Sequence, residues 1–146
     1  MIFIMRVKSL LHIDSDFICF FQTCDILNLE PEMKNGFDIC LDKGTYDAIS
    51  LCQDNSKEMR LQYRQSVFEL LREEDSSSSS NTTTTTTTES PLFFITSCNW
   101  TENELVEFFS PMFQLKTVLP TPKFQFGGQT GNNTTSIVFQ KKKINL

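Results

Sequence analysis

Short apolar runs of strand length alternate along the chain with segments of helical spacing. The runs expected to form strands are residues 17–23, 37–41, 91–96, 113–119 and 134–140. In residues 57–74, apolar side chains recur every three or four positions, at Met59, Tyr63, Val67, Leu70 and Leu71. This spacing predicts an amphipathic helix. Strands that alternate with helices are typical of an α/β sheet, here expected to be parallel in its middle with an antiparallel last strand.

Two residue pairs mark the starts of helices. Asn55 and Glu58 stand three residues apart before the long helix, and Thr101 and Glu104 have the same spacing before a shorter one. In a capping box, each side chain of such a pair accepts a hydrogen bond from the other residue's backbone N–H. We therefore expect a capping box at both starts. The shorter helix should have an apolar face made of Leu105, Phe108 and Phe109.

The chain divides into one domain and segments outside it. Its 146 residues allow one modest domain. A Ser/Thr-rich tract at residues 76–88 has no apolar side chain to bury and is expected to be a disordered surface loop. We expect an unplaced segment at residues 1–16, one domain at 17–141 interrupted at 75–90, and a tail at 142–146. The basic run of residues 141–143 is expected to be solvated.

Charge and cysteine content exclude several classes of protein. A formal net charge of -5 argues against a general nucleic-acid binder, which needs clustered Lys and Arg. The five cysteines form no C-x-x-C pair and the chain has a single His, so no zinc site is expected. An odd number of cysteines in apolar runs suggests reduced, buried thiols in a cytoplasmic protein, possible also in the nucleus. No apolar stretch is long enough to span a membrane.

Polar residues follow four of the expected strands. They are Asp25, then Asp42, Lys43, Gly44 and Thr45, then Ser97, Cys98, Asn99 and Trp100, and finally residues 120–124. Ligands of open α/β sheets bind beyond the carboxyl ends of the strands, so these clusters are the candidate site. Each has a simpler alternative: Asp25 as a turn or cap residue, 42–45 as an ordinary Gly turn, and Asn99 and Trp100 as residues that orient a loop.

Three segments carry a family resemblance. They are residues 37–51 (FDICLDKGTYDAISL), 93–101 (FFITSCNWT) and 119–131 (LPTPKFQFGGQTG). Together they resemble the second half of the class I, seven-β-strand, S-adenosylmethionine-dependent methyltransferases that modify a lysine of elongation factor 1-alpha. The resemblance implies a partial, Rossmann-like α/β sheet, a protein-lysine N-methyltransferase activity, S-adenosylmethionine as cofactor and elongation factor 1-alpha as protein partner. Neither nucleic acid nor membrane is an implied partner.

The same resemblance leaves two rival functions open. The family's Gly-rich turn and its ribose-binding acidic residue have no counterpart here, so this chain alone is not expected to bind the cofactor tightly. One alternative is therefore a truncated, catalytically inactive remnant or binding module of the same family, from a shortened gene model or a real fragment. Another is an unrelated small α/β interaction protein.

By resemblance, each part of the candidate site has an expected role. The cofactor would contact Asp25 and Ile26 at its adenine and Asp42, Lys43 and Gly44 at its methionyl end. The substrate would meet Thr45, Tyr46, Asn99, Trp100, Pro120, Lys123 and Phe124. Asp47 is the expected catalytic residue, holding the incoming lysine or accepting its proton. Asp42 is expected to matter for function and not for folding, as a polar residue at a strand end.

Overall fold

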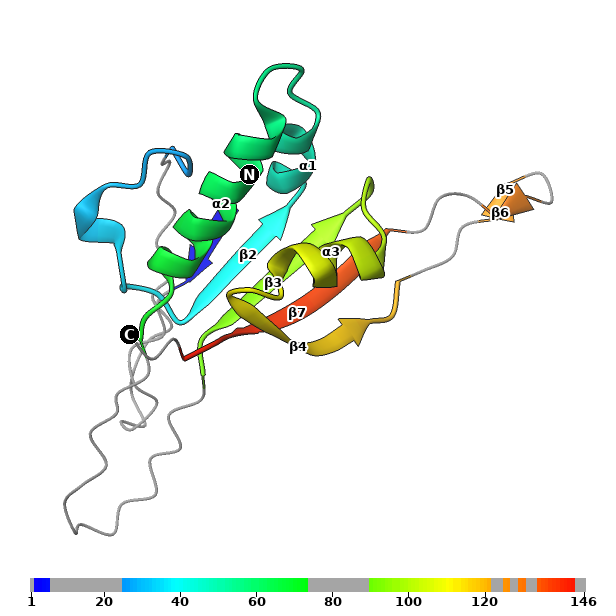
Figure 1. Cartoon of the computed structure of the whole chain (residues 1–146). Helices are drawn as coiled ribbons and strands as arrows, with labels where there is room; N and C mark the ends of the chain where they lie inside the picture. The colour runs from blue at the N-terminus through cyan, green and yellow to red at the C-terminus, as the bar shows by residue number, and fades with distance from the viewer. Residues whose placement is uncertain are drawn as a thin grey trace, which may run out of the picture.

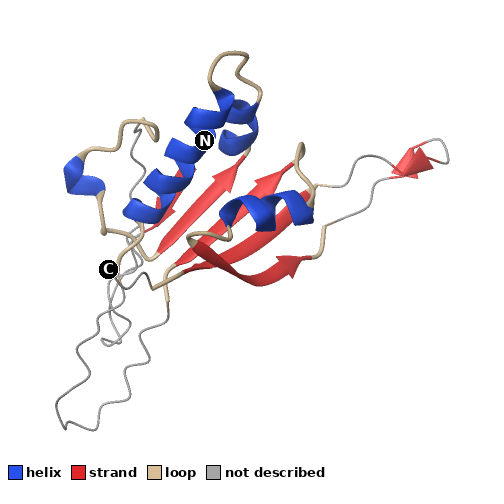
Figure 2. Cartoon of the chain, viewed as in Figure 1, coloured by secondary structure: helices blue, strands red, loops and turns tan. Residues whose placement is uncertain are grey.

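A computed structural model of the chain describes residues 2–5, 25–73, 90–121, 125–126, 129–130 and 134–143. Its main body is a mixed sheet of five strands, β1 (Ile2–Met5), β2 (Ile39–Lys43), β3 (Leu92–Ser97), β4 (Phe113–Leu119) and β7 (Thr135–Lys141). The helices are α1 (Thr45–Ser50), α2 (Ser56–Leu70) and α3 (Glu102–Phe109), with a short 3-10 turn at Pro31–Met33. Helices α2 and α3 lie across one face of the sheet (Figures 1 and 2). The α/β class is confirmed.

The strands are ordered β1-β2-β3-β7-β4. Strands β2 and β3 are parallel, whereas β7 is antiparallel to both β3 and β4. The predicted parallel middle and antiparallel last strand are therefore confirmed. It follows that β2, β3 and β4 all run in the same direction, and their carboxyl ends lie along one edge of the sheet. We call this edge the carboxyl rim. Two short strands, β5 (Gln125–Phe126) and β6 (Gln129–Thr130), pair within the expected loop at 120–133.

Strand β1 corrects an expectation about the start of the chain. It pairs antiparallel with β2, with Ile2 opposite Asp42 and Met5 opposite Ile39. Part of the supposedly unplaced segment 1–16 therefore belongs to the sheet and covers the edge that β2 would otherwise expose. The expected strand at 17–23 lies outside the described residues.

The long helix is confirmed, but both of its ends differ from expectation. Tyr63, Val67 and Leu70 are buried against the sheet. The helix ends at Leu70 because Leu71 is extended and bridges Phe37. The capping box at Asn55 is wrong: this residue has a left-handed φ of 57° and its side chain makes no capping hydrogen bond.

The capping box at the start of α3 is confirmed. The backbone N–H of Glu104 donates to Thr101 Oγ1 at 3.4 Å, and the N–H of Thr101 donates to Glu104 Oε2 at 2.8 Å. Of the expected apolar face, Leu105 and Phe109 are buried and Phe108 is partly buried against the core. The capping box forms here because Thr101 has the extended backbone that a helix N-cap needs.

Phenylalanine rings fill the space between the sheet and the helices. Phe93 of β3 lies 5.2 Å from Phe109 of α3 and 5.5 Å from Phe113 of β4, measured between ring centroids. Phe139 of β7 lies 5.5 Å from Phe109. All four rings are buried, and tilted or edge-on contacts of this kind add to the stabilisation from burial alone.

Two expectations about polar and thiol groups are corrected. Lys141 is not solvated: it closes β7, is 7% exposed, and its ammonium donates to the carbonyl of Leu71 at 2.5 Å while lying over the Phe68 ring. Burial lowers the pKa of Lys141, and the nearby Glu73 opposes this shift. Among the cysteines that are described, Cys40 is buried, but Cys52 and Cys98 are exposed.

Candidate functional site

The carboxyl rim is built first by the end of β2. The strand was expected at 37–41, but it covers Ile39–Lys43, so Asp42 and Lys43 belong to the strand itself. Gly44 then takes a left-handed φ of 85°, a conformation that favours glycine, and α1 begins directly after it. Residues 42–45, for which an ordinary Gly turn was the simpler alternative, are therefore a strand end, one glycine and the start of a short helix that was not predicted.

Asp42 is a buried residue of this junction, with 3% of its surface exposed. Its carboxylate accepts hydrogen bonds from the N–H groups of Thr45 and Tyr46, at 2.7 and 2.9 Å, and from the hydroxyl of Tyr63 at 2.5 Å. Burial, followed by the nearby Asp42 charge, raises the pKa of Tyr63 well above its usual value. Asp42 therefore caps α1 and ties it to α2. The expectation that Asp42 does not matter for folding is wrong.

Lys43 and Gly44 are the accessible part of the same junction. The Lys43 side chain is exposed. Apart from its chain neighbours Lys43 and Thr45, no described residue has a heavy atom within 4 Å of a Cβ placed on Gly44, so the space next to this backbone is open. A ligand can approach the chain closely here, which is not possible at the Asp42 carboxylate.

Asp47 joins α1 to the end of β3. Its Oδ1 accepts a hydrogen bond from the hydroxyl of Ser97 at 2.5 Å, and its Oδ2 accepts one from the N–H of Cys98 at 2.8 Å. The Ser97 oxygen in turn accepts from the N–H groups of Asn99 and Trp100. Ser97, which was named in a candidate cluster without a role of its own, is thus a central residue of the rim. A small hydroxyl residue at the end of a buried strand was its one local signal.

Trp100 is held by a second chain of bonds. Its indole N–H donates to Ser50 Oγ at 3.1 Å, and the Ser50 hydroxyl donates to the carbonyl of Asp47 at 2.7 Å. The Trp100 ring lies 5.6 Å from the buried ring of Tyr46. The structure therefore brings Tyr46, Asp47 and Trp100 together, and exposed Asn99 lies beside them in the chain.

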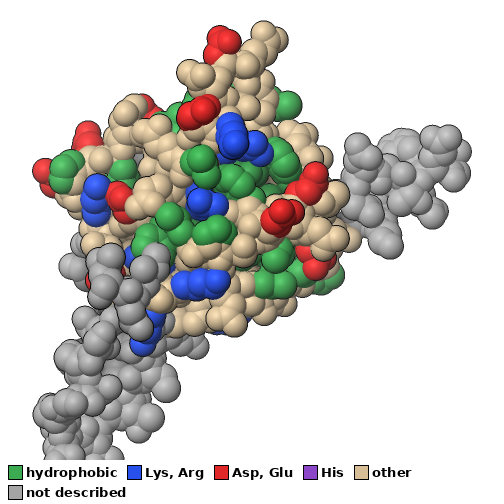
Figure 3. Space-filling model, viewed as in Figure 1, with side chains coloured by type: hydrophobic (Ala, Val, Ile, Leu, Met, Phe, Trp, Pro, Cys, Tyr) green, Lys and Arg blue, Asp and Glu red, His purple; other side chains and the backbone are tan. Residues whose placement is uncertain are grey.

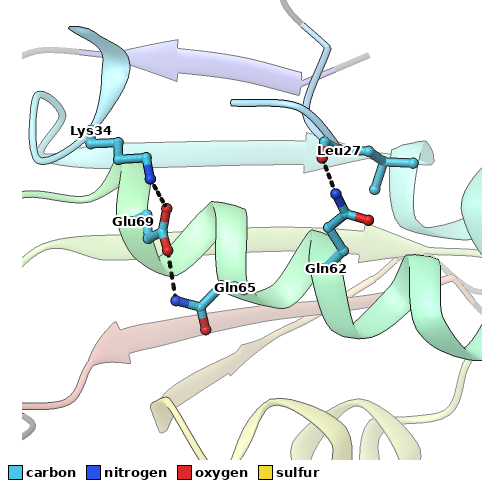
Figure 4. Close-up of polar contacts among 5 residues, drawn as sticks. All are labelled: Leu27, Lys34, Gln62, Gln65 and Glu69. Atoms are coloured by element: carbon cyan, nitrogen blue, oxygen red, sulfur yellow. Dashed lines mark hydrogen bonds and ion pairs between the residues drawn. The ribbon is translucent and has the colours of Figure 1, made fainter. Parts of the chain in front are cut away.

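Asp25 and Ile26 lie on a turn that packs against α2. Asp25 Oδ1 accepts from the N–H of Leu27 at 3.0 Å, and its Oδ2 accepts from the Asn28 amide at 2.7 Å. These bonds, the Asn28 one first, lower the pKa of Asp25. Ile26 is 7% exposed and belongs to the core. The carbonyl of Leu27 accepts a bond from Gln62 of α2 (Figure 4). Asp25 is thus a turn residue, one of the two readings open from the sequence.

The fourth cluster is described only in part. Pro120 is exposed and follows β4 directly, so it lies at the same rim. Lys123 and Phe124 lie outside the described residues. Within the described part of the chain, no group of three or more His, Cys, Asp or Glu side chains could hold a metal ion. No helix in that part is long and apolar enough to cross a membrane.

The rim fits S-adenosylmethionine in part. The open space next to Gly44 and the exposed Lys43 suit a ligand that passes close to the backbone. The Asp42 carboxylate and the Ile26 side chain are buried and already have partners within the protein, so they suit supporting roles and not direct contacts. When bound, this cofactor supplies an electrophilic methyl group.

Comparison with known proteins identifies relatives along most of the chain. "EEF1A lysine methyltransferase 2" of Danio rerio is 43% identical over 120 residues, which are 82% of this chain and 44% of that protein. The Homo sapiens protein of the same name is 46% identical over 80% of this chain and 42% of its own length. "Protein-lysine N-methyltransferase efm4" of Schizosaccharomyces pombe is 34% identical over 82% of this chain and 45% of its own length. No family model matches the chain.

The chain spans about half the length of the curated relatives it matches. The aligned stretch is nevertheless long, and relatives from vertebrates and yeasts carry the same kind of name. The resemblance inferred from its three motifs is confirmed. By sequence, this chain is similar over about four fifths of its length to EEF1A lysine methyltransferase 2 and to the Efm4 protein-lysine methyltransferases.

Proposed function

We propose that this chain forms the carboxyl-terminal half of an S-adenosylmethionine-dependent protein-lysine N-methyltransferase that acts on elongation factor 1-alpha. The observation that carries the proposal is the 43% to 46% identity, over about four fifths of the chain, to relatives named for that activity. The sheet supports it: a parallel pair followed by an antiparallel last strand suits the second half of a Rossmann-like class I methyltransferase.

Methyl transfer to an amine requires little more than positioning. The lysine must be neutral, lie close to the methyl group, and be shielded from water. In the proposed arrangement Lys43 and Gly44 border the methionyl part of the cofactor, and Thr45 and Trp100 border the incoming lysine. Asn99 and Pro120 form the outer wall, and Lys123 and Phe124 are proposed contacts of the substrate.

We assign Asp47 a positioning role first. Both of its carboxylate oxygens already accept bonds from the end of β3, at Ser97 and Cys98. A carboxylate in this state can hold the β3 loop and Trp100 in place and add a negative charge near the substrate amine. Direct acceptance of the lysine proton would use a lone pair that these two bonds leave free.

Localisation in the cytoplasm is part of the same proposal. The cysteines at positions 52 and 98 are free thiols. Free thiols are the rule in reducing compartments, whereas disulfides persist in oxidising ones. Elongation factor 1-alpha, the proposed substrate, would have to share that compartment.

The test is a chimera in which residues 25–143 of this chain replace the aligned stretch of the zebrafish relative. We expect the chimera to transfer labelled methyl groups from S-adenosylmethionine to purified elongation factor 1-alpha, and the 146-residue chain alone to transfer none. An inactive chimera that is folded and still binds the cofactor would contradict the enzymatic proposal. If the chain alone then bound elongation factor 1-alpha, the result would support a binding module.

A further inference from the structure

Two arginines of α2 lie over aromatic rings that belong to α3 and to the residue just before its N-cap. The guanidinium carbon of Arg60 is 5.0 Å from the centre of the Trp100 ring and 5.6 Å from that of Phe108. Arg64, one helical turn later, is 5.0 Å from the Phe108 ring. Such stacking holds each planar cation in a fixed orientation between α2 and α3. We call Arg60, Arg64, Trp100 and Phe108 the cation–aromatic cluster.

Unpaired polar atoms gather at this cluster. In the described part of the chain, the buried side-chain atoms without a hydrogen-bond partner are Tyr46 Oη, Arg60 Nε and Arg64 Nε. Tyr46 is only 1% exposed, and its ring contacts both Trp100 and Phe108. Burial raises the pKa of Tyr46, and Arg60 opposes that rise, which places the guanidinium near the hydroxyl. Buried polar atoms are nearly always paired. The Tyr46 oxygen can accept from the adjacent Arg60 guanidinium, whereas the Nε–H groups of Arg60 and Arg64 point to a missing acceptor.

The cluster also lacks a counter-charge. Arg64 Nη1 donates to the carbonyl of Phe108 at 2.6 Å, but neither Arg60 nor Arg64 forms an ion pair with any described residue. The chain as a whole carries a formal charge of -5. Figure 3 shows Lys and Arg side chains set among hydrophobic ones on the face that carries α2 and α3. An unpaired cationic pair on an acidic chain is complementary to an acidic partner.

The position of the cluster relates it to the rim. Trp100 follows the end of β3, and Tyr46 lies in the first turn of α1, so both belong to the carboxyl rim. A group bound by the arginines would therefore lie next to the place assigned to the substrate lysine. Arginine is suited to this task because its planar fork of donors matches the two oxygens of a carboxylate.

We propose that Arg60 and Arg64, oriented by Trp100 and Phe108, bind an acidic side chain of the protein substrate beside the lysine that is methylated. The inference rests on the proposed function and adds a rule of substrate recognition to it: the modified lysine has an Asp or Glu close by on the substrate surface. Arg60 is the main contact, since Arg64 already donates to the α3 backbone.

The first test compares binding of purified elongation factor 1-alpha to the 146-residue chain and its variants by biolayer interferometry. We expect Arg60→Glu to weaken binding by about tenfold or more, because a repulsive charge replaces the stacked cation. Arg60→Lys keeps the charge but loses the planar fork, and should fall in between. Lys116→Glu is the matched control: it makes the same change of charge on exposed β4 and should bind like the parent chain. Circular dichroism melts check that all variants fold.

A second test uses Trp100 as a probe, because it is the only tryptophan of the chain. A Trp-free hexaglutamate peptide should change its fluorescence, and the change should be lost in Arg60→Glu; hexaserine and inorganic phosphate should have little effect. A response to phosphate alone would overturn the choice of a carboxylate. If Arg60→Glu and the parent chain bound elongation factor 1-alpha equally, the inference would be wrong while the proposed partner stood. If no folded variant bound it, the partner itself would be wrong, and the inference with it.

Discussion

At the scale of single residues, the rim is held together by two buried carboxylates that act across elements. Asp42 ties the end of β2 to α1 and α2, and Asp47 ties α1 to the end of β3. Each accepts its bonds from donors that would otherwise be left unpaired inside the protein. Their first effect is thus on the geometry of the rim, and any effect on chemistry passes through that geometry.

Asp42→Ala should destabilise the fold. The change removes the acceptor of the Tyr63 hydroxyl and of the Tyr46 N–H, both buried, and one acceptor of the part-buried Thr45 N–H. We expect the free energy of unfolding to fall by roughly 2 to 4 kcal/mol, since each buried unpaired group is costly. Urea denaturation followed by circular dichroism measures it. Asp25→Ala, which removes an exposed carboxylate with only local bonds, is the control and should shift the midpoint far less. If both changes had an equally negligible effect on the urea midpoint, the role of Asp42 in holding β2, α1 and α2 together would be contradicted.

At the scale of elements, the start of α3 is determined by residues that are close in sequence. Thr101→Ala removes the side chain that accepts from the N–H of Glu104. Losing an N-cap of this kind costs about 1 kcal/mol, so the melting temperature should fall by a few degrees. A Thr101→Ser variant keeps the hydroxyl and should melt close to the parent chain. Equal losses in both variants would mean that the hydroxyl does not act as a cap.

The same cap should depend on pH. The bonds from the Thr101 side chain and backbone lower the pKa of Glu104 below its ordinary value. Stabilisation by the ionised carboxylate is therefore fully present above the unfolded-state pKa and is lost as the pH falls through the folded-state pKa. Melting curves from neutral to acidic pH should show Glu104→Gln losing its difference from the parent chain in that acidic window. A difference that stayed constant across that window would rule out the ionised cap.

At the scale of the whole molecule, the Ser/Thr-rich tract joins two segments that meet at one place. The N–H of Arg72, before the tract, donates to the carbonyl of Phe37, and the N–H of Leu92, after it, donates to the carbonyl of Asp38. A short connection can therefore span the gap. Replacing residues 76–88 with a short Gly-containing turn should leave the melting temperature unchanged or higher. A marked loss of folded protein on gel filtration would show that the tract is structural.

Cofactor binding should also be decided at this scale. The relatives are about twice as long, and the family resemblance implies that a Gly-rich turn and a ribose-binding carboxylate have no counterpart in this sequence. Losing several polar contacts, each worth roughly 1 to 3 kcal/mol, would weaken binding by orders of magnitude. Titration calorimetry of this chain with S-adenosylmethionine should detect no tight binding. A micromolar dissociation constant would mean that residues near β1 build a substitute site.

Much of the fold could be predicted from the sequence because its signals are local. Each signal depends on residues that are close in sequence. This holds for the periodicity of α2, the Thr101 cap and the apolar runs of β3, β4 and β7. The three motifs identified the family on their own. One boundary failed where a distant segment competes with the local pattern, since Leu71 leaves the helix to pair with Phe37. The predicted cap at Asn55 failed because this residue has a left-handed φ, whereas an N-cap residue has an extended backbone.

What only the tertiary structure decided is which polar residues are free to act. Asp42 meets Tyr63 from 21 positions away, and Asp47 meets Ser97 from 50, so neither partner can be read from neighbouring residues. The same holds for Arg60 and Trp100, which lie on different elements and meet because α2 and α3 pack on one face of the sheet. Sequence spacing determines what a helix or strand presents, whereas the packing of elements determines which groups are buried and paired. For this chain the sequence identified the family and the rim, and the packing separated its supporting carboxylates from the residues that remain open to a substrate.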